Sequence, residues 1–231
     1  MFGSAAAHGE VTWLQPGMYV YSMWGVMVVL TVIGFLAGRK RAMVPSGIQN
    51  VVEFLIEGLY GFLESMLDEE RIKKYFPLLC TFFLYIVTSN YIGLLPGVGH
   101  ADPEIGALGL FIPPTANLSN TAALAIIVFL STHVLGIAAN GLGYFKHFLT
   151  PMWWMLPLNI VEEIVRPVSL AMRLYGNIFG HELVVATLVG MSPWFVPTVM
   201  QLLGTLTGAI QAFVFTLLAT TYIATATAKH H

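Results

Sequence analysis

Long apolar runs constrain this chain more than any other feature of its sequence. The runs at 17–38, 75–96 and 118–140 each have about the 20 residues that a helix needs to cross the hydrocarbon core of a bilayer. Of the 231 residues, 57% are hydrophobic and only 10% are charged, so a single soluble core cannot bury the apolar surface. The sequence therefore predicts an all-α integral membrane protein with one membrane domain over 1–231.

The positions of the basic residues orient the predicted helices. Arg39–Arg41 end the first run, and Lys229 follows the last helix, 198–228. Since short cytoplasmic segments are enriched in Lys and Arg, both ends are expected in the cytoplasm. Together with a long helix segment over 151–190, these positions predict about five crossings. The N-terminus is expected outside and the C-terminus inside.

Segment 46–68 shows an amphipathic pattern. Apolar residues lie on one side of the expected helix and three glutamates lie elsewhere. The apolar residues are Val51, Phe54, Leu55, Leu59, Phe62, Leu63 and Met66. Such a helix is predicted to lie along the cytoplasmic surface of the membrane rather than to cross it.

One charge, Arg173, lies in the middle of an otherwise apolar helix. An arginine at the centre of a membrane helix costs roughly +2.5 to +3.5 kcal/mol on insertion scales. If the helix continues through Pro167, one of its faces is polar and small. That face consists of Glu162, Arg166, Ser169, Arg173, Gly176, Asn177 and Gly180. Small residues let another helix approach closely, so we expect an acidic partner for Arg173 on a neighbouring helix.

The alternative is that Arg173 pairs within its own bundle or extends to the membrane interface. Along a straight helix, Glu162 lies about 16 Å from Arg173, and Glu182 lies about 13 Å away on the opposite face. Neither can form an ion pair with it within the helix. The last helix has a polar stripe containing Gln211, which we interpret as a companion of the arginine.

The third apolar run begins with a polar cluster, and two interpretations of it remain open. The cluster is Thr115, Asn117, Ser119, Asn120 and Thr121. Its hydroxyls and amides could line a water-filled entrance. They could equally cap the helix and form hydrogen bonds between helices.

Motifs for nucleotide or metal chemistry are missing from the sequence. It contains no GxxxxGK[ST] loop, no HExxH and no CxxC, and Cys80 is the single cysteine. We therefore expect no catalytic site in this chain, no cofactor and no bound metal. Any link to nucleotide chemistry would depend on partner proteins.

Four segments of the chain resemble one known family. They are the run RPVSLAMRLYGN at 166–177 with Glu182 beyond it, NYIGLLP at 90–96, PPTAN at 113–117 and GAIQAF at 208–213. In this order they are similar to segments of subunit a of the rotary F-type ATP synthase. The arginine followed by LYGN, with a glutamate nine residues after the arginine, is the most specific of these motifs.

The resemblance implies a role for each matching position. Arg173 matches the essential arginine that faces the ion-carrying carboxylates of a rotating ring of c subunits, and Gln211 matches a glutamine packed near it. The residues implied for the outer half-channel are Asn90, Asn117, Asn177, His181 and Glu182. Those implied for the cytoplasmic half-channel are Glu162 and Glu163. The last two helices are implied to form a long tilted hairpin that faces the ring.

Two positions depart from the best-known bacterial pattern. Position 181 is His where some members have Gly, and position 204 is Gly where some members have His or an acid. We infer that His181 substitutes for the polar group that is absent at Gly204. In addition, Gly93 occupies a position that is acidic in some relatives, which argues against a strict proton-wire role for that span.

The resemblance also implies partners and a location. The partners are the c-subunit ring, the b-subunit peripheral stalk and, through that stalk, a soluble ATPase sector, with no nucleic acid. The expected location is a bacterial inner membrane, with protons weakly favoured over Na⁺ as the coupling ion because of His181.

Two other classes of protein were considered. A haem-binding membrane subunit would use His133, His147 or His181 as axial ligands, but no two of them share a helix at facing positions. A stand-alone secondary transporter would suit intramembrane Arg and Glu residues, but it predicts internal repeats, and none is visible in the sequence.

Overall fold

The computed structural model describes residues 16–39, 47–92, 113–141, 144, 156–191 and 195–228. Within these ranges the chain forms helices and no strand. The elements are α1 (Pro16–Arg39), α2 (Ile48–Glu64), α3 (Glu69–Ile92), the 3₁₀ turn η2 (Pro114–Ala116), α4 (Leu118–Asn140), α6 (Leu156–Met191) and α7 (Phe195–Thr227). The predicted all-α class is confirmed.

Three of these helices contain stretches long and apolar enough to cross a membrane. They are Glu69–Ile92, Leu118–Asn140 and Thr198–Thr227, and α1 adds a shorter apolar stretch, Val20–Leu36. These stretches support the prediction of an integral membrane protein. The count of five crossings and the direction of the termini stay predictions.

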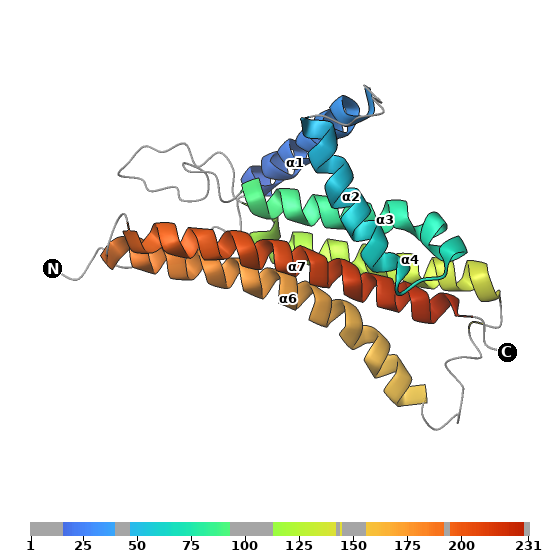
Figure 1. Cartoon of the computed structure of the whole chain (residues 1–231). Helices are drawn as coiled ribbons and strands as arrows, with labels where there is room; N and C mark the ends of the chain where they lie inside the picture. The colour runs from blue at the N-terminus through green and yellow to red at the C-terminus, as the bar shows by residue number, and fades with distance from the viewer. Residues whose placement is uncertain are drawn as a thin grey trace.

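Helices α3, α4, α6 and α7 pack together and form the core of the molecule (Figure 1). Leu79, Ile86, Leu174, Phe215 and Ile223 are almost completely buried between them. A contiguous apolar cluster of this kind holds the helices in fixed register. Polar side chains that lie within it are therefore held in fixed positions.

The long helices α6 and α7 lie side by side over most of their length (Figure 1). Asn177 contacts Thr207, and Arg166 lies over Tyr222, so the two helices run antiparallel. Helix α6 continues through Pro167, as the polar face of the sequence requires. Its first turns diverge from α7 in Figure 1. A proline within a helix removes one backbone hydrogen bond and favours such a bend.

Helix α2 packs against α1 and α3. Leu59 and Leu63 are buried, and the Phe62 ring lies edge-on to Phe213 of α7, with ring centroids 4.6 Å apart. Val51 and Phe54, predicted on the same apolar side, stay exposed at 59% and 75%. Only the second half of the predicted apolar side is therefore used for packing within the chain. The exposed half is free to contact lipid, and the location of α2 at the membrane surface stays a prediction.

Several sequence-based predictions fall on residues outside the described ranges. These are the N-terminal tail, Lys40 and Arg41, Gly93 and the loop after it, His147, and the C-terminal residues from Lys229 onward.

Candidate functional site

The guanidinium of Arg173 lies exposed on α6. No ion pair or hydrogen bond to it occurs within the described residues, whereas Arg71, Lys73 and Arg166 all pair with carboxylates there. The alternative in which Arg173 pairs with Glu162 or Glu182 is therefore not seen: Glu162 binds Arg166 instead. The charge at 173 therefore has no ionic partner among the described residues.

Helices α6 and α7 expose large apolar side chains. On α6, Val168 and Met172 are exposed at 55% and 52%, and on α7, Leu206 and Ile210 are exposed at 59% and 52%. Large apolar side chains exposed in this way are typical of surfaces that face lipid or another membrane helix.

Two glycines on the same helix are not explained by packing within the chain. A Cβ added at Gly176 or Gly180 would meet no neighbouring atom within 4 Å in the described part of the chain. Their small size is therefore not needed for contacts between α6 and the other described helices. Small residues do allow a helix of a different protein to approach closely.

Gln211, the predicted companion of Arg173, lies on α7 and is only 8% exposed. No hydrogen bond joins it to the exposed guanidinium in the described residues. The structure thus places the two groups on the paired helices α6 and α7, and their interaction stays a prediction.

His181 packs directly against Gly204 of α7. A Cβ at Gly204 would collide with Nε2 and Cε1 of the imidazole, so a glycine is required there while the ring keeps its position. The Nε2 atom is buried, and it has no hydrogen-bond partner in the described structure. His181 therefore fills the space next to position 204, and its substitution for a polar group at that position stays a prediction. Its neighbour Glu182 is half-buried.

Buried hydrogen bonds connect α3, η2 and α7 at Asn90. Its Nδ2 donates to the Gly208 carbonyl at 3.0 Å, and its Oδ1 accepts from the Thr115 hydroxyl at 2.7 Å. The Asn90 Cβ lies only 3.3 Å from the position that a Gly208 Cβ would take, so the glycine permits this close approach. On the adjacent helix pair, Asn177 Nδ2 donates to the Thr207 carbonyl at 3.4 Å.

Polar residues at the start of α4 cap this helix and form a hydrogen bond to α3. Asn117 caps α4 by accepting a hydrogen bond from the Ser119 amide at 2.8 Å, and Asn120 accepts one from the Tyr85 hydroxyl of α3 at 3.3 Å. Besides His181 Nε2, two buried polar atoms have no hydrogen-bond partner in the described structure, Ser89 Oγ and Asn120 Nδ2. Buried polar groups of this kind usually bind ordered water. The water-filled entrance therefore stays a compatible interpretation.

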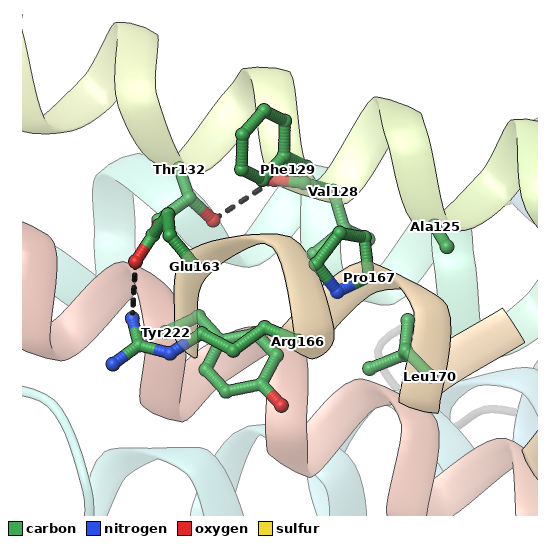
Figure 2. Close-up of a pocket in the computed structure, with 9 residues that line it drawn as sticks. All are labelled: Ala125, Val128, Phe129, Thr132, Glu163, Arg166, Pro167, Leu170 and Tyr222. Atoms are coloured by element: carbon green, nitrogen blue, oxygen red, sulfur yellow. Dashed lines mark hydrogen bonds and ion pairs between the residues drawn. The ribbon is translucent and has the colours of Figure 1, made fainter. Parts of the chain in front are cut away.

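The second arginine of α6 has a very different environment from Arg173. Arg166 pairs with Glu162 Oε1 at 2.7 Å and with Glu163 Oε2 at 3.1 Å, and its guanidinium lies over the Tyr222 ring of α7, 5.4 Å from the centroid. His133 of α4 approaches the other oxygen of Glu163 at 3.4 Å. Figure 2 shows Arg166 extended across Tyr222, with Glu163 between it and α4.

From the sequence, Glu162 and Glu163 were expected in the cytoplasmic half-channel, and their ion pairs with Arg166 were not predicted. The spacings of three and four residues were visible in the sequence and are typical of helical ion pairs. The approach of His133 was not visible, because it depends on the packing of α4 against α6. No group of three or more His, Cys, Asp or Glu side chains that could hold a metal ion occurs among the residues described.

The sequence is similar to known proteins of one family. The sequence matches the family model described as "ATP synthase A chain" over residues 20–224. It is 44% identical over 204 residues to ATP synthase subunit a of Geobacter sulfurreducens, covering 87% of this chain and 83% of the relative. It is 43% identical over 206 residues to the subunit a of Moorella thermoacetica, covering 89% and 88%. The subunit a of Trichlorobacter lovleyi is 43% identical over 204 residues, covering 87% and 83%.

Proposed function

This chain belongs to the ATP synthase A chain family, and from that premise we propose that it is the ion-channel stator subunit of an F-type ATP synthase, with Arg173 as the residue that meets the carboxylates of a c-subunit ring. The observation that carries this proposal is the exposed guanidinium of Arg173, which has no ion pair among the residues that the structure describes. A permanent charge on an apolar surface is costly unless another chain supplies the opposite charge.

The arrangement of α6 and α7 supports a rotor-facing surface. Both helices expose large apolar side chains next to Arg173, and Gly176 and Gly180 leave room for an approaching helix. A ring that turns past this surface needs such a smooth apolar contact. Gln211 lies on the helix paired with that of Arg173, and we assign it to the same interface.

Two half-channels are assigned on either side of Arg173. The outer half-channel uses Asn90, Asn117, Asn177, His181 and Glu182. Three buried polar atoms support this assignment, because they have no hydrogen-bond partner within the described residues and could bind water. They are His181 Nε2, Ser89 Oγ and Asn120 Nδ2. The cytoplasmic half-channel uses Glu162 and Glu163, which lie about three turns from Arg173 toward the start of α6.

The chemistry follows from the cost of charge in lipid. A ring carboxyl that carries its ion is neutral and can face lipid, whereas a bare carboxylate cannot. Close to Arg173 the carboxylate form is favoured, so the ion leaves into one half-channel, and the site is reloaded from the other. Because the guanidinium stays protonated, it also blocks direct passage of cations between the half-channels. Each elementary charge that crosses 100 mV releases about 2.3 kcal/mol. Rotation of the ring sums this energy over several ions.

The same assignment includes the remaining partners and the orientation. We assign the chain to a membrane sector with a c ring and a b-subunit stalk, which connects it to the soluble ATPase, in a bacterial inner membrane. The N-terminus is assigned to the outside and the C-terminus to the cytoplasm. The chain itself needs no nucleotide site for this role.

The test is the Arg173→Ala variant in the whole complex, reconstituted in vesicles. We expect no detectable ion-driven ATP synthesis, while the amount of assembled complex stays normal because Arg173 forms no ion pair or hydrogen bond within the described part of the chain. Arg71→Ala, which removes another cation with an ion pair at the start of α3, should keep normal synthesis. Near-normal synthesis by Arg173→Ala would refute the assignment. Ion uptake by the purified chain alone would favour a secondary transporter instead.

A further inference from the structure

His133 forms two contacts that together determine where its protons lie. Its Nδ1 is 2.9 Å from the Phe129 carbonyl oxygen, and its Nε2 is 3.4 Å from Glu163 Oε1. A carbonyl oxygen only accepts, so Nδ1 carries a hydrogen and donates it. The remaining nitrogen, Nε2, therefore faces the carboxylate oxygen either as a bare lone pair or as an N–H donor.

A bare Nε2 opposite an ionised carboxylate would bring two lone pairs together, which is repulsive. The contact becomes favourable only when a proton lies between the two groups, on the imidazole or on the carboxyl. His133 and Glu163 therefore form a pair that holds one exchangeable proton and connects α4 to α6.

The surrounding charges also favour one added proton. Arg166 is a single positive charge that contacts two carboxylates, Glu162 and Glu163, so this group has a net charge of −1 before a proton is added. Among the described residues, the other titratable groups near the pair are Tyr222, under the guanidinium, and Tyr144, whose ring centroid lies 5.9 Å from that of His133. One proton on the pair thus brings the cluster to neutrality.

The side chains of the cluster differ in exposure, so that a partly buried pair lies next to an exposed carboxylate. The side chain of Glu162 is 61% exposed, whereas those of His133 and Glu163 are 24% and 15% exposed. Beside Glu163, a small cavity lined by Thr132, Phe129, Arg166, Tyr222 and others leaves about 10 Å³ for the centre of a water molecule, roughly the room for one water (Figure 2). The pair is thus enclosed but lies one residue from a solvent-facing carboxylate.

We propose that His133 and Glu163 act as a single proton-holding site in the cytoplasmic half-channel, with Arg166 as the residue that positions Glu163. This inference rests on the function proposed above and adds His133 to it. A proton released by a ring carboxyl reaches the pair through water, and the charge of the cluster changes from −1 to zero. The same proton then leaves to water near Glu162, and the charge returns to −1.

The test uses the whole complex in vesicles, with the rate of proton transport measured against pH on the cytoplasmic side. The variants are His133→Gln, Glu163→Gln and the double variant. Each single variant is expected to slow transport about ten-fold or more and to lose the pH dependence of the wild type, because a proton-transfer group is lost. The double variant should be no slower than the slower single variant, since the two groups act as one site.

Ser131→Ala, on α4 two residues from His133 and outside the ion-paired cluster, is the matched control and should keep the wild-type rate and pH profile. Native gels report assembly for every variant. A wild-type pH profile in both single variants, or additive losses in the double variant, would overturn the proposal. Infrared difference spectra of the unmodified complex add an independent readout: a carboxyl or imidazolium band must titrate and must change in Glu163→Gln, and its absence would overturn the proposal as well.

Failure of this inference can be told apart from failure of the proposed function. If Arg173→Ala is inactive while His133→Gln transports protons with an unchanged pH profile, only the role of His133 is wrong. If Arg173→Ala is active, the proposed function itself is wrong.

Discussion

Arg166 and Arg173 lie about two turns apart on the same helix, yet their environments are opposite. Arg166 pairs with two carboxylates of its own helix and covers an aromatic ring of α7. Arg173 pairs with nothing in the described chain and lies exposed among apolar side chains. The comparison shows that Arg166 contributes to the packing of the bundle, whereas Arg173 has no charged partner within the described residues.

The glycines of the same hairpin show the same contrast. Gly204 is in contact with the His181 imidazole and cannot accept a side chain without moving it. Gly176 and Gly180 face open space. The fold of this chain explains the first glycine, whereas no contact within the described residues explains the other two.

The largest effect is expected from filling the open glycine surface. Gly176→Leu adds a side chain where this chain has nothing within 4 Å, so folding should be unaffected. A leucine there would obstruct a ring helix, and we expect ATP-driven proton pumping to be lost almost completely. Gly58→Leu, at an exposed helical glycine of α2 that also has nothing within 4 Å, is the matched control. Equal activity of both variants would contradict the rotor-facing assignment.

A smaller effect, on stability rather than on transport alone, is expected when the paired arginine is removed. Arg166→Met leaves Glu163, only 15% exposed, without its cation. Removing one partner of a fully buried pair costs about 3–5 kcal/mol. Because this pair is partly exposed, we expect about 1–3 kcal/mol, measured by thermal unfolding of the complex. Adding Glu163→Gln should restore much of the loss. If Arg173→Ala destabilised the complex as strongly as Arg166→Met, the contrast between the two arginines would be wrong.

Glu182→Gln should sharpen the assignment of the outer half-channel. The substitution keeps the size of a half-buried side chain but removes its titration. We expect proton entry to slow about ten-fold, at the low end for a proton-transfer group because water can replace part of its function. The dependence of the rate on the outer pH should weaken at the same time. An unchanged rate with an unchanged pH profile would remove Glu182 from the pathway.

The smallest effect is expected at an exposed ion pair outside the cluster. Lys73 Nζ lies 2.7 Å from Glu69 Oε1, and both side chains are more than half exposed. Exposed pairs of this type contribute little to stability, because water and salt screen the two charges. Lys73→Gln should therefore change the unfolding midpoint only slightly and leave transport intact. A loss of stability as large as that of Arg166→Met would show that the exposure of an ion pair does not predict its contribution to the stability of this protein.

Parts of the candidate site could be predicted from local sequence. The spacing of Arg173 from Glu162 and Glu182 excluded ion pairs within the helix, and the structure agrees. The spacing of Glu162 and Glu163 from Arg166 would also have allowed their ion pairs to be predicted, because residues three and four apart are neighbours on a helix, but this prediction was not made. Gln211 was expected near Arg173; no hydrogen bond joins them within the described residues, and the expectation stays a prediction. The direction of a side chain on a separate helix depends on how the two helices are rotated against each other.

The sequence by itself determined the all-α membrane class, the position of the unpaired charge and the family, since these depend on composition, on the 3.6-residue helical period and on specific motifs. Only the tertiary structure decided which partners meet across the bundle. Asn90 bonds to Gly208, 118 residues away, Glu163 meets His133 of another helix, and His181 fills the space at Gly204. The physical reason is that helical periodicity is local, whereas these contacts depend on the register of packed helices, which many apolar contacts set together.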